Sequence, residues 1–350
     1  MSPAPPTIPL SEIVGHPRLA LGRRAPDPLI RGLAYDSRNV QPGDLFVCLC
    51  GAKDDGHRHA ADAARRGAVA ILGERPAEGL DGLPQITVAD SRSELARLAA
   101  RFYGEPSTSL HLTGVTGTEG KTTTVYLLDA ILRGAGRATG MFGTIVNRVR
   151  ACSEPATLTT PESLDLQRLL WECVQAGVTH VVMEVSSHAL AQGRVAGCEF
   201  DQAVCTNLHS DHLDFHGTLE RYRAAKAALF AGLGRGPTKA GVGLGVVNAD
   251  DPFASSSQPG VRRLARRRSA GISWPVGARE HRRTTTAARR HSRWCFVVIG
   301  YDETRALITA HSGVTENRLI PYREFLWSWG KKGNWTLRIR PKDGARGTRL

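Results

Sequence analysis

The residues best suited to chemistry lie in one stretch, residues 117–124, which reads Gly-Thr-Glu-Gly-Lys-Thr-Thr-Thr. Glycines let a loop bring its backbone N–H groups close to phosphate oxygens, and the positive end of a following helix favours negative charge. A lysine there can contact the outer phosphates, and the hydroxyl next to it can bind Mg²⁺. The predicted nucleotide-binding residues are Gly117, Thr118, Glu119, Gly120, Lys121, Thr122 and Thr123.

The elements around this loop fit that chemistry. Residues 110–116 are rich in β-forming side chains, and residues 125–132 carry apolar side chains at helical spacing. Val115 stands where the strict phosphate-loop pattern has glycine, so an ordinary glycine-rich turn before a helix is the alternative. The Lys121-Thr122 pair at the helix start favours the nucleotide interpretation.

Two more candidates follow predicted strands. Glu184 lies at the end of the apolar segment 178–185, and His212 follows the strand-like segment 203–208. In doubly wound sheets, ligands bind beyond the carboxyl ends of the strands. We therefore expect Glu184, His212 and the glycine loop to converge on one site.

His212 also belongs to a cluster of potential metal ligands, which comprises His209, Asp211, His212, Asp214 and His216. Such a cluster occurs in zinc or two-metal hydrolases, and it occurs as often in plain loop and helix-cap contacts. The nearby nucleotide loop favours Mg²⁺ with ATP.

Lys226 is a cation on the apolar face of a predicted helix, residues 219–233. That face comprises Leu219, Tyr222, Lys226, Leu229 and Phe230. One interpretation is a lysine whose stem is buried while its amine reaches water. The other is a lysine with a perturbed pKa that takes part in the site.

The chain is predicted to be an α/β protein with two folded domains and a tail. Residues 1–30 form an N-terminal extension, and residues 31–105 form a small α/β substrate domain. Residues 106–256 alternate strands and helices at the spacing of a mostly parallel sheet, so they form the domain of the nucleotide loop. Residues 257–350 follow as an irregular basic tail, in which only residues 295–299 resemble a strand.

The net charge of +13 belongs to the tail. Residues 261–350 hold 21 basic and 6 acidic residues, whereas residues 1–260 hold 25 and 27. Arginine and tryptophan together, as in this tail, can bind nucleic acid. Because the charge changes abruptly and the segment lacks periodicity, we instead expect a poorly ordered tail. Nucleic-acid binding would then be limited to non-specific contacts through it.

Composition also bears on the compartment. The first thirty residues contain no long apolar run, so we expect neither a signal peptide nor a membrane span. Seven cysteines without the CxxC spacing of metal sites are expected to be reduced thiols. We expect a cytoplasmic protein that acts as a monomer.

A series of ordered motifs resembles the Mur ligases, and the later ones are similar to the MurE type, UDP-N-acetylmuramoyl-tripeptide synthetase. The motifs are Asp36-Ser-Arg38, Pro42-Gly-Asp-Leu-Phe46, Asp55-Gly-His57, the loop at 117–124, Thr159-Thr-Pro161, Met183-Glu-Val-Ser-Ser-His-Ala-Leu190, Gln192-Gly-Arg194 and Thr206-Asn-Leu-His-Ser-Asp-His-Leu-Asp-Phe-His-Gly217. The resemblance covers residues 33–253.

The resemblance implies an ATP-dependent amide ligase of peptidoglycan precursor synthesis. Such an enzyme phosphorylates the free glutamyl carboxylate of UDP-N-acetylmuramoyl-L-alanyl-D-glutamate. The amine of a diamino acid, either diaminopimelate or lysine, then attacks the acyl phosphate. Because the carboxylate and the γ-phosphate are both anionic, the site needs a strong positive clamp and close alignment. The implied cofactors are ATP and two Mg²⁺ ions.

The resemblance also implies roles for single residues, with Lys121, Lys226 and His212 as catalytic groups. Thr122 and Glu184 would hold the first Mg²⁺. Glu184, His212 and Lys226 would hold the second, Lys226 as a carbamate formed from its neutral amine and CO₂. Burial favours the neutral amine, and magnesium prefers oxygen ligands. The implied substrate-binding residues are Ser37, Thr159, Thr160, Ser186, Gln192 and Arg194.

After residue 253 the family continues with the rest of its ATP-binding domain and with a C-terminal domain that selects the diamino acid. The basic tail stands in that place here, so we expect a truncated ligase with little turnover. Two alternatives remain. One is a metal-dependent hydrolase built on residues 209–216, and the other is a nucleic-acid-binding protein that acts through the tail.

Overall fold

The computed structural model describes residues 6–15, 27–51, 54–80, 82–241, 243–247, 296–302, 307–312 and 315–321. The chain divides into two compact units, Met1–Val261 and Arg262–Leu350. The first unit holds two larger sheets with their helices, so the boundary predicted at residue 105 falls inside it.

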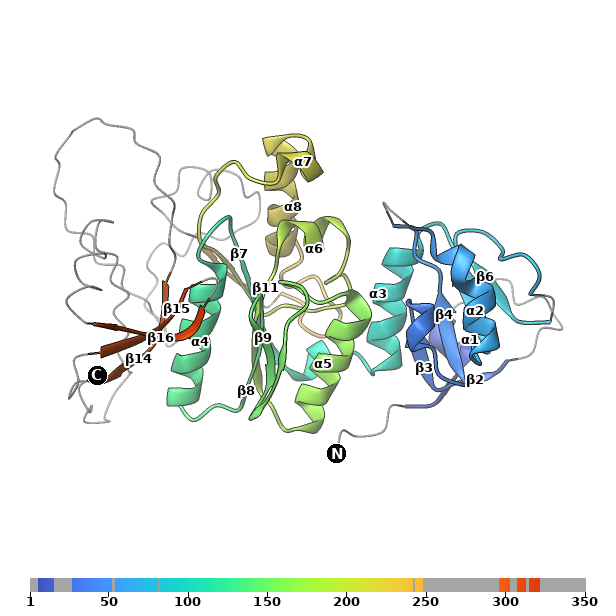
Figure 1. The fold of residues 1–350 in the computed structure, drawn as a ribbon, viewed down its shortest axis with the longest axis horizontal. Helices are drawn as coiled ribbons and strands as arrows, with labels where there is room; N and C mark the ends of the chain where they lie inside the picture. The colour runs from blue at the N-terminus through green and yellow to red at the C-terminus, as the bar shows by residue number, and fades with distance from the viewer. Residues whose placement is uncertain are drawn as a thin grey trace. The chain divides into compact units, whose positions relative to one another are not determined.

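The first sheet has four parallel strands in the order β3-β4-β5-β6 (Figure 1). Its strands are β3 (Gly32–Ala34), β4 (Asp44–Val47), β5 (Ala70–Gly73) and β6 (Gln85–Thr87). The accompanying helices are α1 (Leu10–Val14), α2 (Ala60–Arg65), α3 (Ser91–Phe102) and the 3-10 turns η1 (Ser37–Asn39) and η2 (Gly56–His59). A short antiparallel ladder joins β1 (Ile8–Pro9) to β2 (Leu29–Ile30).

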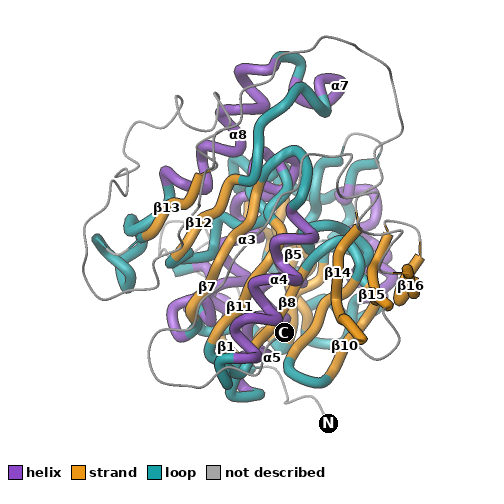
Figure 2. Tube along the Cα trace, turned by 90° about the vertical axis from the view of Figure 1, so that its left-hand side faces the viewer, coloured by secondary structure: helices purple, strands orange, loops and turns teal. Residues whose placement is uncertain are grey.

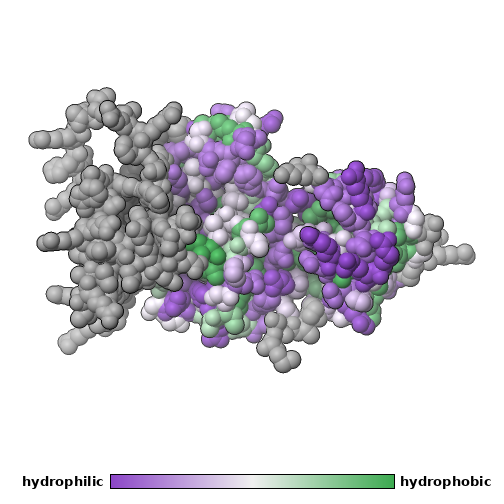
Figure 3. Space-filling view, viewed as in Figure 1, coloured by the Kyte–Doolittle hydropathy of each residue, from purple (hydrophilic) through white to green (hydrophobic). Residues whose placement is uncertain are grey.

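Strand β4 separates two apolar cores. Leu45 and Val47 pack with residues of α1 and α3, whereas Phe46 packs with Ala60 and Ala63 of α2. Successive side chains of a strand point to opposite faces, so helices cover both sides of this sheet. The outer side of α2 is exposed and charged, and Figure 3 shows a hydrophilic surface over it.

The second sheet has seven strands in the order β10-β9-β8-β11-β7-β12-β13 (Figure 2). They are β7 (His111–Thr116), β8 (Thr139–Phe142), β9 (Val146–Val149), β10 (Cys152–Pro155), β11 (His180–Glu184), β12 (Gln202–Cys205) and β13 (Leu244–Val247). The pairs formed by β8, β11, β7, β12 and β13 are parallel, and β9 and β10 add antiparallel pairs at one edge. The predicted α/β class with a mostly parallel sheet is confirmed.

Helices cover both faces of this sheet. They are η3 (Pro106–Ser109), α4 (Lys121–Gly134), α5 (Ser163–Gln175), α6 (Ser187–Ala191), α7 (Leu213–His216) and α8 (Leu219–Ala231). In β11, Val181 packs in the core that contains Leu170 of α5, and Val182 packs with Val125 of α4. This alternation places α4 and α5 on opposite faces (Figure 1). No described helix combines the length and hydropathy that a bilayer crossing requires.

The second unit contains a three-stranded antiparallel sheet of β14 (Phe296–Asp302), β15 (Leu307–Ser312) and β16 (Thr315–Pro321). The prediction of a single strand in the tail is therefore wrong. Antiparallel strands tolerate polar residues at alternate positions, so β15 and β16 lack the continuous apolar run that marked the first strand.

The remaining parts of the predicted tail, residues 257–295, 303–306, 313–314 and 322–350, lie outside the described residues. The same holds for residues 248–256, the predicted end of the central domain. Poor order of the tail stays a prediction.

Lys239 connects the segment between α8 and β13 to the seven-stranded sheet through buried polar contacts. Its buried amine donates to the carbonyls of Leu110 (2.6 Å) and Glu199 (3.1 Å) and pairs with Asp201 Oδ2 at 2.6 Å. Removing one partner of a buried ion pair leaves the other charge uncompensated. We expect Lys239→Met to lower the free energy of unfolding by about 3 kcal/mol in urea denaturation.

Arg133→Met is the control for that experiment. The Arg133 side chain is exposed and lies 3.8 Å from Asp129 Oδ2, so its loss should cost no more than about 1 kcal/mol. Equal losses for the two variants would contradict the role given to Lys239.

Candidate active site

The glycine loop joins β7, in the middle of the seven-stranded sheet, to the start of α4. Gly117 has φ of +140° and Gly120 has φ of +79°. A Cβ atom at Gly117 would lie 2.0 Å from the Thr206 hydroxyl, so the close approach of β12 requires glycine there. The first amides of α4 have no acceptor within the helix and are available to an anion. The predicted strand–loop–helix arrangement is the one observed.

Two lysine side chains meet on one carbonyl of this loop. Lys121 Nζ donates to Gly117 O at 3.0 Å and to Thr118 O at 2.9 Å, and Lys226 Nζ donates to the same Gly117 O at 2.7 Å. Lys226 is 2% exposed, so the interpretation in which its amine reaches water is wrong. Helix α8 buries Lys226 beside Tyr222, which lies one turn before it.

Burial changes the ionisation of both lysines. It lowers the pKa of Lys121. Burial, together with the positive charge of Lys121, lowers the pKa of Lys226 from 10.5 to about 7. A substantial share of Lys226 is therefore a neutral amine near neutral pH.

This shift predicts that the contribution of Lys226 to stability increases as the pH rises above 7. From pH 7 to 10.5 the unfolded chain binds a proton at Lys226 that the folded chain has lost. The part of the free energy of unfolding that depends on Lys226 should therefore rise with pH by up to about 1.4 kcal/mol per unit. Below pH 7 both states are charged, and the penalty for burying the charge is complete.

The measurement compares wild type with Lys226→Met in urea, at pH 7, 8 and 9, in CO₂-depleted buffer. The difference between the two proteins should grow with pH in favour of wild type. Parallel pH dependences would show that Lys226 is not the titrating group.

Glu184 ends strand β11, which pairs with β7 through Glu184 and Val115. The carboxylate belongs to a residue that is 1% exposed. Its Oε2 accepts from the Thr122 hydroxyl at 3.0 Å, and its Oε1 accepts from the Thr144 amide at 2.8 Å. Burial raises the pKa of Glu184. The two predicted ligands of the first Mg²⁺ are thus adjacent, and both offer the hard oxygen atoms that magnesium prefers.

His212 lies at the same edge of the sheet and is half exposed. It has φ of +51° and precedes α7, and its Nε2 lies 3.3 Å from Asp211 Oδ2. Its ring centroid is 6.5 Å from that of Tyr222. The Tyr222 hydroxyl forms a 2.8 Å hydrogen bond with the Thr118 hydroxyl, and the centroid of the Tyr222 ring lies 4.7 Å from Lys226 Nζ. Among the described residues, no hydrogen bond or ion pair joins His212 to Glu184 or Lys226.

The predicted substrate residues surround the end of β11. The Thr144 and Thr159 hydroxyls are 3.2 Å apart. The Thr160 hydroxyl donates to Glu184 O at 3.0 Å, and the Ser186 amide donates to that hydroxyl at 3.0 Å.

Arg194 completes this group. It donates to Thr160 O (3.1 Å) and to Gln192 Oε1 (2.7 Å), and it pairs with Glu162 at 3.1 Å. Its buried Nε has no partner among the described residues. Burial lowers the pKa of Arg194. Glu162 also pairs with Arg92 of α3 at 3.1 Å, a contact that the sequence did not predict.

Ser37 stands apart from this group. It is buried in η1, beside the first sheet, and none of its described contacts reaches the other predicted site residues. Two residues before Ser37, the Tyr35 hydroxyl donates a 2.6 Å hydrogen bond to Asp165 of α5.

The cluster at residues 209–216 does not form a metal centre in the described structure. Among the described residues, the one group of three or more potential ligands that converge within 4.8 Å is Cys50, Asp55 and His57. His216 is buried and packs against the Tyr222 ring at 5.4 Å between centroids. The two-metal hydrolase interpretation therefore has no support from the geometry.

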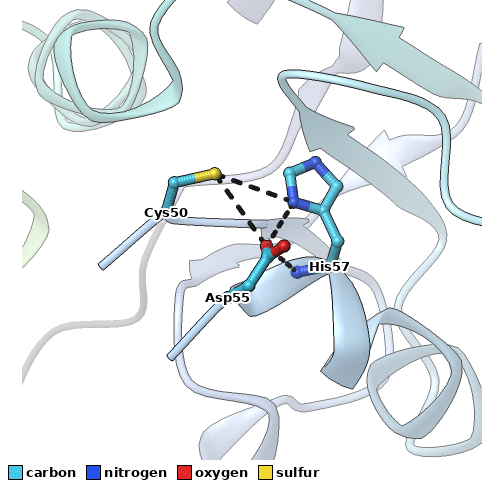
Figure 4. A group of neighbouring side chains, drawn as sticks. All are labelled: Cys50, Asp55 and His57. Carbon is cyan, nitrogen blue, oxygen red and sulfur yellow. Dashed lines mark hydrogen bonds and ion pairs between the residues drawn. The ribbon is translucent and has the colours of Figure 1, made fainter. Parts of the chain in front are cut away.

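Hydrogen bonding argues against a metal at Cys50, Asp55 and His57 as well (Figure 4). His57 Nε2 accepts from the amides of Glu74 (3.1 Å) and Arg75 (3.4 Å), so Nδ1 carries the proton and donates to Asp55 at 2.7 Å. A metal on Nδ1 would require a protonated Nε2 facing two N–H groups. Burial also raises the pKa of the Cys50 thiol. The three residues belong to a hydrogen-bonded turn, and the Asp55-Gly-His57 motif marks this turn in the sequence.

Two protein-family models match this chain, and together they cover residues of both larger sheets of the first unit. Residues 115–290 match the Mur ligase middle domain, and residues 29–103 match the catalytic domain of the Mur ligase family. The middle-domain match continues beyond residue 256, the predicted end of the central domain.

Several curated relatives carry the name UDP-N-acetylmuramoyl-L-alanyl-D-glutamate–2,6-diaminopimelate ligase. The one from Geobacillus thermodenitrificans is 51% identical over 66% of this chain and 47% of its own length. The one from Geobacillus kaustophilus is 52% identical over 65% and 46%. The chain thus spans about half the length of these relatives.

A solved structure supports the same grouping. The structure of a UDP-N-acetylmuramoyl-L-alanyl-D-glutamate–2,6-diaminopimelate ligase superposes with a TM-score of 0.60 and 31% identity, over 71% of this chain and 48% of that one. The sequence matches, the fold and the ordered motifs agree, and the chain belongs to the Mur ligase family.

Proposed function

We propose that this chain carries the nucleotide and substrate sites of a MurE-type ligase. The reaction would join diaminopimelate to UDP-N-acetylmuramoyl-L-alanyl-D-glutamate with ATP, through an acyl phosphate, in the cytoplasm. The relatives above are named for this reaction, and their sequence identities to this chain, 51% and 52%, support the proposal. The observation that carries the proposal is the convergence of Lys121, Lys226, Thr122 and Glu184 around the glycine loop.

In this proposal Lys121 and the first amides of α4 bind and orient the triphosphate. Thr122 and Glu184 would hold one Mg²⁺, and Glu184, His212 and Lys226 would hold a second. When bound, these ions neutralise charge on the phosphates and on the acceptor carboxylate. The oxygen-rich donors of Thr122 and Glu184 fit that metal.

We propose that Lys226 acts as a carbamate. Its neutral amine would attack CO₂, form an N–C bond and release one proton, which leaves an anionic oxygen donor. Burial beside Lys121 supports the neutral amine, and the resulting anion would relieve the repulsion between the two side chains.

Thr159, Thr160, Ser186, Gln192 and Arg194 are proposed to bind the muramoyl-dipeptide, and Ser37 its uridine-diphosphate end. Thr160 bonds the carbonyl of Glu184, and the Ser186 amide and the Arg194 guanidinium both bond Thr160, which supports a role for these residues in placing the acceptor beside the metals. The positive side chain of Arg194 suits an acidic group of the substrate.

The test is ADP release in the presence of Mg²⁺, with each substrate omitted in turn. We expect slow release that requires both UDP-N-acetylmuramoyl-L-alanyl-D-glutamate and diaminopimelate, and L-lysine is tested in place of diaminopimelate. Mg²⁺-dependent hydrolysis of the nucleotide-sugar without ATP would overturn the proposal in favour of a hydrolase.

A further inference from the structure

The segment that follows β12 forms several hydrogen bonds with the glycine loop. The side-chain oxygen of Asn207 accepts from the Glu119 amide at 2.9 Å, and its side-chain nitrogen donates to the Glu119 carbonyl at 3.1 Å. The backbone carbonyl of Asn207 accepts from the Thr118 amide at 2.9 Å. The Thr206 hydroxyl adds a bond of 2.5 Å to the Glu119 carbonyl. Two consecutive loop residues are thus held from the neighbouring strand.

These contacts divide the backbone groups of the loop. The amides of Thr118 and Glu119 are committed to Asn207, whereas those of Lys121, Thr122 and Thr123 belong to the first turn of α4 and have no intrahelical acceptor. The Glu119 carbonyl is bonded toward Thr206 and Asn207. A carbonyl that turned toward the phosphates instead would repel them.

We infer that Asn207 is a positioning residue for the phosphate loop. Its amide fixes the backbone of Glu119, so that the amides at the start of α4 face the nucleotide and the Glu119 carbonyl does not. The inference rests on the proposed nucleotide site. Only a side chain with one donor and one acceptor in a plane can make both bonds, and carboxylate replaces the donor with a second acceptor.

The experiment uses Asn207→Asp in the full chain, with the affinity for Mg·ADP measured by calorimetry at pH 8 and pH 5. At pH 8 the charged oxygen opposes the Glu119 carbonyl, and we expect affinity to fall on the order of tenfold to a hundredfold. At pH 5 a larger fraction of the aspartate is protonated than at pH 8, and that fraction can again donate and accept. The ratio to wild type should therefore recover in part, whereas a defect that does not depend on this charge would leave the ratio unchanged.

The chain offers a matched control. Gln85 holds Ala77 with the same two-bond arrangement, at 2.8 Å and 3.1 Å, in the first sheet. Gln85→Glu should disturb its own contact and leave the affinity for Mg·ADP unchanged at both pH values. An equal loss of affinity in both variants would overturn the inference.

Hydrogen exchange of a peptide covering residues 117–121 is a second readout that does not need nucleotide. Exchange of the Glu119 amide should accelerate in Asn207→Asp at pH 8. Unchanged exchange, or equal affinity of wild type and variant, overturns the inference alone. No nucleotide binding by wild type overturns the proposed function together with it. If Asn207→Asp does not fold, Asn207→Ala replaces it and must lose affinity at both pH values.

Discussion

Lys226→Ala should lower the rate of ADP release by at least about a hundredfold, the loss typical of removing a charged group from a preorganised site. The reason is that Lys226 approaches the loop from a different helix than Lys121 and meets it on the Gly117 carbonyl. As a carbamate it would supply an anionic oxygen ligand that the alanine variant lacks. The measurement is kcat in a coupled ADP assay, in CO₂-depleted buffer and with added bicarbonate.

Lys226→Arg separates the two possible roles of this side chain. Arginine keeps the positive charge but stays protonated and cannot form the carbamate. We expect it to be as inactive as Lys226→Ala, and we expect bicarbonate to stimulate only the wild type. An active arginine variant would contradict the carbamate and leave a simple cation in its place.

Glu184→Gln should raise the Mg²⁺ concentration needed for half-maximal ADP release at least about tenfold. Replacing even a residue that only hydrogen-bonds to a metal ligand typically lowers metal affinity by about that factor. Glutamine preserves the size of the side chain, and its one carbonyl oxygen can still accept from the Thr144 amide while its NH₂ group donates to the Thr122 hydroxyl. The variant therefore loses the negative charge and one of the two oxygen acceptors. Mg²⁺ titrations of wild type and variant give the comparison.

Glu172→Gln is the control for that titration. Glu172 lies on α5 and pairs with Arg168 at 2.7 Å, away from the glycine loop. Its replacement should leave the Mg²⁺ dependence unchanged. The metal role of Glu184 would be wrong if both variants shifted the titration alike.

Local pattern predicted the elements that carry the site. The apolar run before the loop and the helical spacing after it are properties of neighbouring residues, and they correspond to β7 and α4. The apolar face predicted for residues 219–233 likewise corresponds to α8, where Tyr222, Lys226, Leu229 and Phe230 are buried. In each case the period of the side chains follows from the helix or strand itself.

Contacts between distant segments were not predictable in this way. Asn207 holds Glu119 across 88 positions, and Arg92 meets Glu162 across 70. The position of Ser37 beside the first sheet, apart from the other predicted substrate residues, likewise came from the structure. The hairpin β15–β16 was also not predicted, because its polar residues interrupt the apolar run that indicates a strand.

The chemical identity of the loop and the family could be read from residue order alone, because a phosphate loop needs particular side chains at particular spacings. The folded chain decided between the two interpretations of Lys226, and the different roles of the loop amides came only from the folded chain. Both depend on which side chains the sheet brings within about 3 Å, since desolvation and hydrogen bonding act at contact distance. Sequence neighbours alone do not specify those contacts.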